Sequence, residues 1–374
     1  MLLVRMIHKQ FFHKSFIASV VAATVIFCGS QLNYTWAQTS APQNSSTTKS
    51  PQAKATFTLQ GHIWTIEALA FSPDGQTLVS GSYDHTVKVW NLANGKLVRT
   101  LDGHKDGVND VLISPDGKLF FTAGGTAEPN TNKVIKVWDM KTKKLLRTLK
   151  GHTLGVTSLA ITPDGKTLVS GSYDKTIKFW DPQKGIRKRT LTGHTSPVRS
   201  VAISPDGKTL ASGGGSLKSD SDKTVKLWNL EAGELKSNIK GNKNVITFIG
   251  FTPDGKYLVN STDPKINVWD LTTGKLVNRF RVSDIEGVTS ATLGNDSKSI
   301  VTTTLDGAVT MWDLTTGKAM KTLVEAANNP QNYDEIYPTS TAFSPDGKTI
   351  AIGNGGGAYN SKFPINIRTV NSEQ

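Results

Sequence analysis

Residues 151–181 of the 374-residue chain read GHTLGVTSLAITPDGKTLVSGSYDKTIKFWD. The stretch opens on Gly-His and sets three short apolar runs around two turn sequences, Thr-Pro-Asp-Gly and Tyr-Asp-Lys. In the first turn the proline presets φ and the glycine tolerates a positive φ, which together close a hairpin. The pattern predicts strands over residues 156–161, 167–172 and 176–180, and a fourth strand over residues 187–192 after a turn at 182–185.

The same unit is written seven times along the chain. Successive turns of this kind begin 42, 48, 42, 48, 42 and 50 residues apart, so the core unit is 42 residues with insertions in particular copies. A repeat of about 40 residues with four strands is typical of a propeller blade. We therefore predict an all-β, seven-bladed β-propeller of four-stranded antiparallel blades over residues 54–374. The turns begin at Ser72, Ser114, Thr162, Ser204, Thr252 and Ser344, with a degraded copy at residues 294–297.

The seventh copy is one strand short. It supplies strands near residues 340–343, 349–352 and 365–368, and the sequence then ends at Gln374. Residues 55–60 precede the first Gly-His in the way that a fourth strand precedes each later copy. We expect this N-terminal strand to complete the last blade, which closes the ring and removes a free sheet edge.

The first 37 residues differ in composition from the rest. Three cations precede an apolar run over residues 16–28, which is the pattern of a secretory signal peptide. The run is shorter than the roughly 20 apolar residues of a spanning helix, and residues 35–37 suit cleavage after Ala37. Residues 38–53 are rich in Ser, Thr, Pro and Gln and are expected to form a flexible linker. The cations are Arg5, Lys9 and Lys14.

This N-terminal segment leaves alternatives open. An uncleaved membrane anchor over residues 1–37 is the main one, and it is the way in which we expect the protein to meet a membrane. A lipid anchor on Cys28 is disfavoured because bulky Phe27 precedes it. Cys28 is the single cysteine, so a cleaved chain would have no disulfide. Either way, we predict an exported protein that is periplasmic or secreted.

The formal net charge of +13 raises the possibility of a polyanionic partner. Much of the charge falls in the predicted fourth strands, where Lys and Arg discourage edge-to-edge pairing. We favour that structural reading, which makes nucleic acid an unlikely partner; binding of a polyanion such as nucleic acid or a cell-surface polymer stays as the alternative. The cationic segments are residues 96–99, 143–150, 187–189 and 318–321.

Neither catalysis nor metal binding is predicted. The histidines do not stand with carboxylates at metal-ligand spacing, and the glycine-rich stretches lack the Lys-Ser/Thr of a phosphate loop. Residues 220–222 (Asp-Ser-Asp) lack the Gly and Glu of a calcium loop and are read as a hairpin tip. An enzyme in the propeller mouth is the weaker alternative, because few carboxylates beyond Glu67, Asp334 and Glu335 would converge there. We predict no enzyme activity, no cofactor and no metal.

Three motifs recur in the copies: Gly-His, Ser-Pro-Asp-Gly and Gly-Ser-x-Asp-x-Thr-Val-Lys-Val-Trp-Asn/Asp. Together they resemble the WD-repeat β-propeller family, in a form similar to bacterial exported members. The resemblance covers residues 54–374 and says little about function, since propellers carry unrelated activities. It implies a His, Ser/Thr, Asp and Trp network within a blade. Later copies depart from it, with Asn132 for Asp, Asn242 and Asp284 for His, and Arg368 for Trp. The complete sets are His62, Ser80, Asp84 and Trp90; His152, Ser170, Asp174 and Trp180; and His194, Ser212, Asp222 and Trp228.

The insertions all belong to one end of the predicted propeller. They lie in residues 124–133, 213–223, 325–337 and 354–363, and each joins strands at the end opposite the Pro-Asp-Gly turns. Long loops in compact domains are often functional. The resemblance implies that partners bind this face through residues just after Gly-His and just before the turn Asp. Those residues are Trp64, Thr65, Glu67, Tyr83, Asn109, Thr157, Tyr173, Arg199, Thr247, Thr289 and Tyr337.

Tyr, Trp and Arg are the residue types enriched at binding hot spots. The alternative is that Tyr83 and Tyr173 only pack the hairpin. The remaining positions are small and polar, which favours a protein or peptide partner over an apolar ligand. We therefore predict a non-catalytic, monomeric scaffold that binds a protein or peptide of unknown identity.

Overall fold

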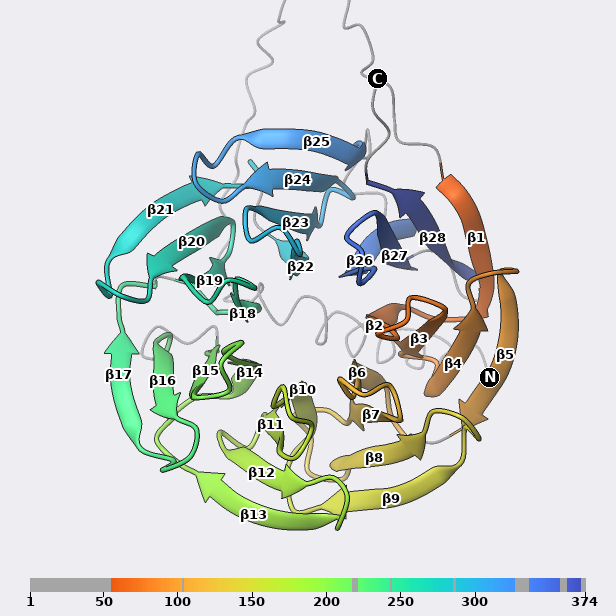
Figure 1. Cartoon of the computed structure of the whole chain (residues 1–374), viewed down its shortest axis with the longest axis horizontal. Helices are drawn as coiled ribbons and strands as arrows, with labels where there is room; N and C mark the ends of the chain where they lie inside the picture. Colours follow the sequence, from red (N-terminus) through yellow and green to blue (C-terminus); the bar gives the residue numbers. More distant parts are fainter. Residues whose placement is uncertain are drawn as a thin grey trace, which may run out of the picture. The chain divides into compact units, whose positions relative to one another are not determined.

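The computed structural model describes residues 55–102, 104–216, 221–242, 244–284, 287–326, 336–356 and 362–370. These residues contain 28 strands and no helix. The strands form seven four-stranded antiparallel sheets arranged as blades around a centre (Figure 1). The predicted all-β seven-bladed propeller is confirmed. The predicted signal peptide (1–37) and linker (38–53) lie outside the described residues.

Each blade runs from an inner to an outer strand (Figure 1). The inner strands are β2 (Ile66–Phe71), β6 (Val108–Ile113), β10 (Val156–Ile161), β14 (Val198–Ile203), β18 (Ile249–Phe251), β22 (Val288–Leu293) and β26 (Ile336–Phe343). The second strands are β3 (Thr77–Ser82), β7 (Leu119–Gly124), β11 (Leu168–Ser172), β15 (Thr209–Gly214), β19 (Tyr257–Thr262), β23 (Ser299–Thr304) and β27 (Thr349–Gly356).

The third strands are β4 (Thr86–Asn91), β8 (Val134–Asp139), β12 (Ile177–Asp181), β16 (Val225–Asn229), β20 (Lys265–Asp270), β24 (Val309–Asp313) and β28 (Phe363–Thr369). The outer strands are β5 (Lys96–Asp102), β9 (Leu145–Lys150), β13 (Ile186–Leu191), β17 (Leu235–Ile239), β21 (Leu276–Arg281), β25 (Ala319–Val324) and β1 (Ala55–His62). Blade 1 is β2–β5, and the blades are numbered along the chain to blade 7, which is β26–β28 with β1.

A Ser/Thr-Pro-Asp-Gly turn closes the first hairpin of every blade except blade 6, and it does so through its own side chains. In blade 3, Thr162 Oγ1 donates to Asp164 Oδ1 at 2.5 Å and accepts the Thr167 N–H at 3.0 Å. Gly165 takes φ 70° and its N–H donates to the Thr162 carbonyl at 2.8 Å. The degraded turn of blade 6 keeps this shape because Ser297 takes φ 57° in place of glycine. The strands of blade 3 begin and end within one residue of the prediction.

The apolar core lies between neighbouring blades. Val79, Val87 and Val89 of blade 1 pack in one cluster with Phe120 and Trp138 of blade 2. Similar clusters join the next pairs of blades, so each blade buries a face against its neighbour. With the blades packed in this way, most of the exposed strand residues lie on the outermost strands.

The ring closes where β1 pairs with β28. Leu59 is opposite Ile365, is 1% exposed, and packs with Ile365 and Ile367. The predicted completion of the last blade by residues 55–60 is confirmed.

The strands of blade 7 are longer than expected, because β26 begins at Ile336 and β27 continues to Gly356. Glycines make this possible, since a Cβ at Gly353 would come within 2.7 Å of Ile66 and one at Gly355 within 2.5 Å of Thr65.

The outer strands carry the excess positive charge. All four cationic segments fall on, or directly before, β5, β9, β13 and β25, which are the outer edges of their sheets. On β13, Arg187 and Lys188 are exposed and Arg189 is half-buried. The cations are therefore spread around the circumference rather than gathered at one end of the propeller.

Candidate functional site

The Ser/His/Asp residues of blade 3 form a closed hydrogen-bonded network with Trp180. Ser170 Oγ lies 2.8 Å from His152 Nε2 and accepts the Trp180 Nε1–H at 2.9 Å, while His152 Nδ1 lies 2.8 Å from Asp174 Oδ2. Because Trp Nε1 only donates, the Ser170 hydroxyl can donate to Nε2, and His152 then donates its Nδ1–H to the carboxylate. Blades 1 and 4 repeat this arrangement with His62, Ser80, Asp84 and Trp90, and with His194, Ser212, Asp222 and Trp228.

The environment of the network keeps its histidine neutral and its aspartate charged. Burial lowers the pKa of His152, an effect that the hydrogen bond to Asp174 opposes only in part. Burial by itself would raise the pKa of Asp174, but hydrogen bonds from His152 and Thr176 hold that pKa well below its usual range. His152 is 6% exposed. The arrangement therefore satisfies buried polar groups and leaves no accessible nucleophile.

Blade 2 has a weaker version of the network. Thr122 replaces Ser and still accepts the Trp138 Nε1–H at 3.0 Å, but Asn132 lies 3.4 Å from His104 Nδ1. Without a carboxylate partner, burial and the nearby Lys136 lower the pKa of His104 to about 3.

Blade 5 contains a different network that the sequence analysis missed. Trp269 Nε1 donates to Asn260 Oδ1 at 2.8 Å, and Asn260 and Asn267 both donate to Asn242 Oδ1, at 3.3 and 3.1 Å. Three asparagines thus replace the Ser/His/Asp set. Blade 6 keeps the Trp312 to Thr302 hydrogen bond at 2.9 Å.

In blade 7, Arg368 stands in the Trp position and donates to the Leu323 carbonyl at 2.6 Å, which ties the blade to blade 6.

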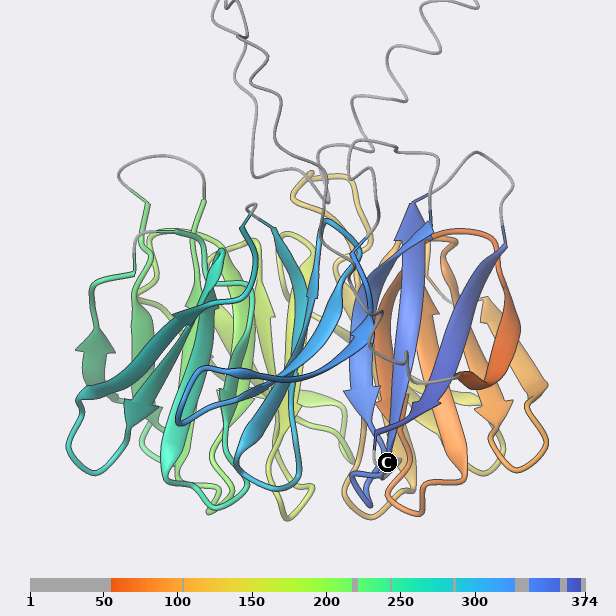
Figure 2. The same ribbon diagram turned by 90° about the horizontal axis from the view of Figure 1, so that it is seen from above.

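We define the long-loop face as the end of the propeller that carries the connections from second to third strands and from each blade to the next. Figure 2 shows these connections at one end and the Pro-Asp-Gly turns, on the short-turn face, at the other. Strands β7, β15, β25 and β27 all end at the long-loop face, as the sequence predicts for the insertions that follow them. Residues 217–220, 327–335 and 357–361 of those insertions lie outside the described residues.

Aromatic candidates lie together at the blade 1–2 junction of the long-loop face. The rings of Trp64 and Tyr83 pack edge to face, with centroids 5.9 Å apart and an angle of 80°. Tyr83 also covers the backbone of blade 2, because a Cβ at Gly107 would come within 2.8 Å of its ring. Both side chains are half-buried, and the neighbouring Ile63 is 63% exposed.

Tyr173 and Arg199 form a second pair across blades 3 and 4. The Arg199 guanidinium carbon lies 5.6 Å from the centroid of the Tyr173 ring, and Arg199 Nε donates to the Gly215 carbonyl at 3.3 Å. Both side chains are half-buried. The contact holds a cation and an aromatic ring in place at the surface.

The small polar candidates mostly join neighbouring blades. Asn109 Nδ2 donates to the Val156 carbonyl at 2.8 Å, Thr157 Oγ1 to Val198 at 2.6 Å and Thr289 Oγ1 to Pro338 at 3.3 Å. In blade 7 the matching position is Thr339, which donates to the Ile66 carbonyl at 2.7 Å. Thr339 was not among the predicted residues because blade 7 has no Gly-His from which to count.

The remaining candidates have mixed surroundings. Thr65 is 3% exposed and packs against Gly355, so its side chain fills space between blades 1 and 7. Thr247 is exposed and lies 2.8 Å from Ser261 Oγ. Tyr337 is half-buried on β26, opposite Gly355. Glu67 is half-buried on β2, and burial raises its pKa to about 7.

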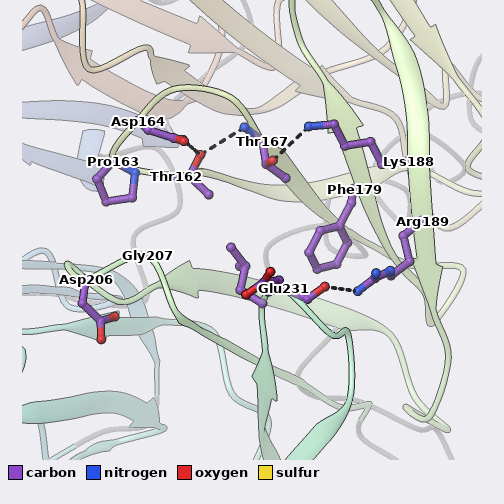
Figure 3. A pocket seen from close by; sticks show the side chains of 11 residues that line it. Thr162, Pro163, Asp164, Thr167, Phe179, Lys188, Arg189, Asp206, Gly207 and Glu231 are labelled. Atoms are coloured by element: carbon purple, nitrogen blue, oxygen red, sulfur yellow. Dashed lines mark hydrogen bonds between the residues drawn. The ribbon is translucent and has the colours of Figure 1, made fainter.

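A cavity of about 470 Å³ lies on the short-turn face between blades 3 and 4 (Figure 3). Phe179 and Leu230 line it together with groups of both charge signs. Lys188 Nζ donates to Thr167 Oγ1 at 3.2 Å and to the Lys166 carbonyl at 2.9 Å, and Arg189 donates to the Glu231 carbonyl at 2.8 Å. The sequence analysis did not predict this hollow, which depends on how two blades meet.

Five stretches of the chain match the family model of the WD domain, G-beta repeat: residues 53–91, 95–139, 143–181, 185–229 and 233–270. The chain belongs to the WD40 repeat family. The matched stretches make up more than half of the chain. Each stretch begins near an outer strand and ends on the third strand of the next blade, the same offset that lets β1 complete blade 7. Blade 6 and strands β26–β28 of blade 7 lie beyond the matched stretches of this WD40 propeller.

Known relatives match this WD40 propeller over short segments. The small ribosomal subunit protein RACK1y of Oryza sativa subsp. japonica is 48% identical over 67 residues, which are 17% of this chain and 20% of that protein. The nuclear distribution protein PAC1 of Coccidioides posadasii is 35% identical over 88 residues, 21% of this chain and 19% of that protein.

An uncharacterized WD repeat-containing protein of Synechocystis is 42% identical over 66 residues, 17% of this chain and 19% of that protein. Each match thus spans only about a fifth of the relative.

No group of three or more His, Cys, Asp or Glu side chains in the described part of the WD40 propeller could hold a metal ion. Within those same ranges no helix is long and apolar enough to cross a membrane.

Proposed function

We propose that this WD40 propeller is an exported, non-catalytic scaffold that binds a protein or peptide partner through its long-loop face. The observation that carries the proposal is the pair formed by Tyr173 and Arg199, with the guanidinium 5.6 Å from the ring centroid at the surface of two blades. A second pair, Trp64 and Tyr83, lies at the blade 1–2 junction. Rigid aromatic and guanidinium groups lose little entropy on binding and are the usual anchors of interfaces.

The geometry of the polar residues supports a scaffold over an enzyme. The His, Ser and Asp side chains that could form a catalytic trio are buried with Trp in three blades. Most of the small polar candidates are engaged in hydrogen bonds between blades. The groups that the long-loop face presents to a ligand are therefore mainly its aromatic rings, Arg199 and Glu67, which are held on a rigid frame.

The names of the relatives agree with a role in assemblies. One group is named as small ribosomal subunit proteins and another as nuclear distribution proteins. Because the matches span about a fifth of those proteins, they supply no partner for this chain. A protein or peptide partner, bound by a monomeric propeller, is our proposal.

Export rests on the sequence of residues 1–37. The cations before an apolar run, and the residues suited to cleavage after Ala37, support a periplasmic or secreted location or a membrane-anchored one. N-terminal sequencing of the protein from its native source checks this, since cleavage leaves Gln38 as the first residue.

The proposal is tested by affinity capture with the propeller and a triple variant, Tyr83→Ala, Tyr173→Ala and Arg199→Ala. A matched control carries Lys118→Ala, Lys166→Ala and Lys256→Ala, exposed positions on the short-turn face. We expect the triple variant to lose partners that the control retains. If both variants retain the same partners, the long-loop face is not the binding site.

Polyanion binding is a second candidate, favoured by the cations of β13, where Arg187 and Lys188 are exposed. It would require affinity for heparin with a steep salt dependence, lost on changing Arg187, Lys188 and Arg189 to Glu. Two of these cations, Lys188 and Arg189, already donate to groups of blades 3 and 4. We therefore favour the protein-binding function.

A further inference from the structure

The inner strands are joined to one another by a belt of side-chain hydrogen bonds. Besides the bonds of Asn109, Thr157, Thr289 and Thr339, the next residue along the strand often adds another. Asp110 Oδ2 accepts the Leu159 N–H at 2.6 Å, Ser200 Oγ accepts the Ile249 N–H at 2.9 Å, and Ser340 Oγ donates to the Ile66 carbonyl at 2.8 Å. At the blade 5–6 junction the bond comes instead from the turn between β19 and β20, where Asp263 Oδ1 accepts the N–H groups of Gly287 and Val288. Among the described residues, these side-chain hydrogen bonds bridge every junction except the one between blades 1 and 2.

The exception is the blade 1–2 junction. The two belt positions of β2 hold Glu67 and Ala68, and alanine has no polar group. Glu67 makes no hydrogen bond or ion pair with any residue in the described ranges. In blades 2, 3, 6 and 7 the matching side chain donates to a backbone carbonyl of the next inner strand. The carbonyl at the equivalent position for blade 1 is that of Val108. An ionised carboxylate has no hydrogen to donate, so Glu67 cannot make to Val108 the hydrogen bond that Asn109 makes to Val156.

Resting on the proposed partner-binding function, we propose that Glu67 is a subsite for one cationic side chain, a lysine or an arginine, of the bound protein or peptide. An ammonium or guanidinium group can donate to the Glu67 carboxylate and to the Val108 carbonyl together, which completes the belt at this junction. Glu67 lies near the long-loop end of β2, five residues after His62 and on the same junction as Tyr83.

The surroundings of Glu67 disfavour the ionised form of its carboxyl group. Burial raises its pKa to about 7, because no cation or donor compensates the loss of water. A bound cation would favour the ionised form and lower that pKa. Arg199, which matches Glu67 in blade 4, is already held over Tyr173 and so does not reach this junction.

The test is a ¹³C NMR titration of the full chain with labelled glutamate carboxyl groups. The small probes are Nα-acetyl-lysine methylamide, Nα-acetyl-arginine methylamide and the neutral Nα-acetyl-glutamine methylamide. The Glu67 signal is assigned by its loss in Glu67→Gln. We expect the lysine and arginine probes to shift this signal saturably and to lower its pKa, and the glutamine probe to do neither. In Glu67→Gln the cationic probes should bind about tenfold more weakly or worse, as expected for losing a charge-assisted hydrogen bond.

Two controls keep the test decisive. Glu128→Gln removes an exposed acid from the β7–β8 connection on the same face and should leave probe binding unchanged. Glu67→Gln should also fold at least as stably as the natural chain, because an amide can donate to Val108 as Asn109 does to Val156. Equal binding of the cationic probes to Glu67→Gln, or no saturable response in the natural chain, overturns the proposal.

Failure of the Glu67 subsite can be distinguished from failure of the proposed partner-binding function. If Glu67 fails to bind cations while the Tyr83, Tyr173 and Arg199 variant still loses its partners, the scaffold function stands and the subsite falls. If Glu67 binds the cationic probes while that variant keeps all partners, the subsite stands and the partner-binding function of this face falls.

Discussion

Trp180 Nε1 donates to Ser170 Oγ at 2.9 Å in the interior of blade 3. The same hydroxyl lies 2.8 Å from His152 Nε2, so a single small side chain satisfies two buried ring nitrogens. Ser170→Ala should therefore leave both without a partner and lower the free energy of unfolding by roughly 1–3 kcal/mol. Urea unfolding of the two proteins measures the difference.

Ser170→Thr is the matched control for that variant. Threonine already fills this place in blades 2 and 6, where Thr122 and Thr302 accept the Trp hydrogen bond at 3.0 and 2.9 Å. The threonine variant should retain more stability than the alanine variant. Equal losses would mean that packing, and not the network, makes Ser170 important.

Closure of the ring by β1 can be tested at Leu59. Its side chain is 1% exposed between β1 and blade 1, so Leu59→Ala should cost about 2–5 kcal/mol of unfolding free energy. Thr58→Ala, at an exposed neighbour on the same strand, should change stability by less than about 0.5 kcal/mol. Indistinguishable melting of these two variants would contradict closure by β1.

Asp110 should make the stability of the propeller depend on pH. Burial raises its pKa to about 7 in the folded state, against about 4 in an unfolded chain. The folded state therefore binds a proton that the unfolded state releases, and the stabilising contribution is complete below about pH 4 and lost as the pH rises through about 7. Asp110→Asn cannot titrate, so the stability of the natural chain relative to this variant should fall between pH 4 and 8.

Urea unfolding of both proteins at several pH values checks this. Comparing the pair cancels the opposite contribution of His62 and His152, whose lowered pKa values make stability fall as the pH drops below about 6.5. A difference that stays constant, or that grows with pH, would show that Asp110 is ionised as easily in the fold as outside it.

The fold could be predicted from the sequence because its rules are local. The Thr162-to-Gly165 turn sets its own hydrogen bonds, and seven copies of such a turn fix the strand order and the register. Closure followed from the missing fourth strand of blade 7. The longer β26 and β27 were not predicted, because they depend on Gly353 and Gly355 lying against blade 1.

The candidate site was harder to predict because its residues belong to different blades. Asn109 and Thr157 match the positions of partner contacts, but their bonds to Val156 and Val198 are made across a junction that no single repeat contains. The Asn242, Asn260 and Asn267 network was missed for another reason. Asparagine at all three positions satisfies Trp269 with a pattern that no other blade repeats.

The most direct test of the central claim is site-specific photo-crosslinking of the propeller in its native source. A photoreactive residue in place of Tyr173, on the long-loop face, is compared with one in place of Lys166, on the short-turn face. We predict a discrete protein or peptide adduct at position 173 that is absent at position 166. An adduct at position 166 with none at 173 would contradict binding through the long-loop face.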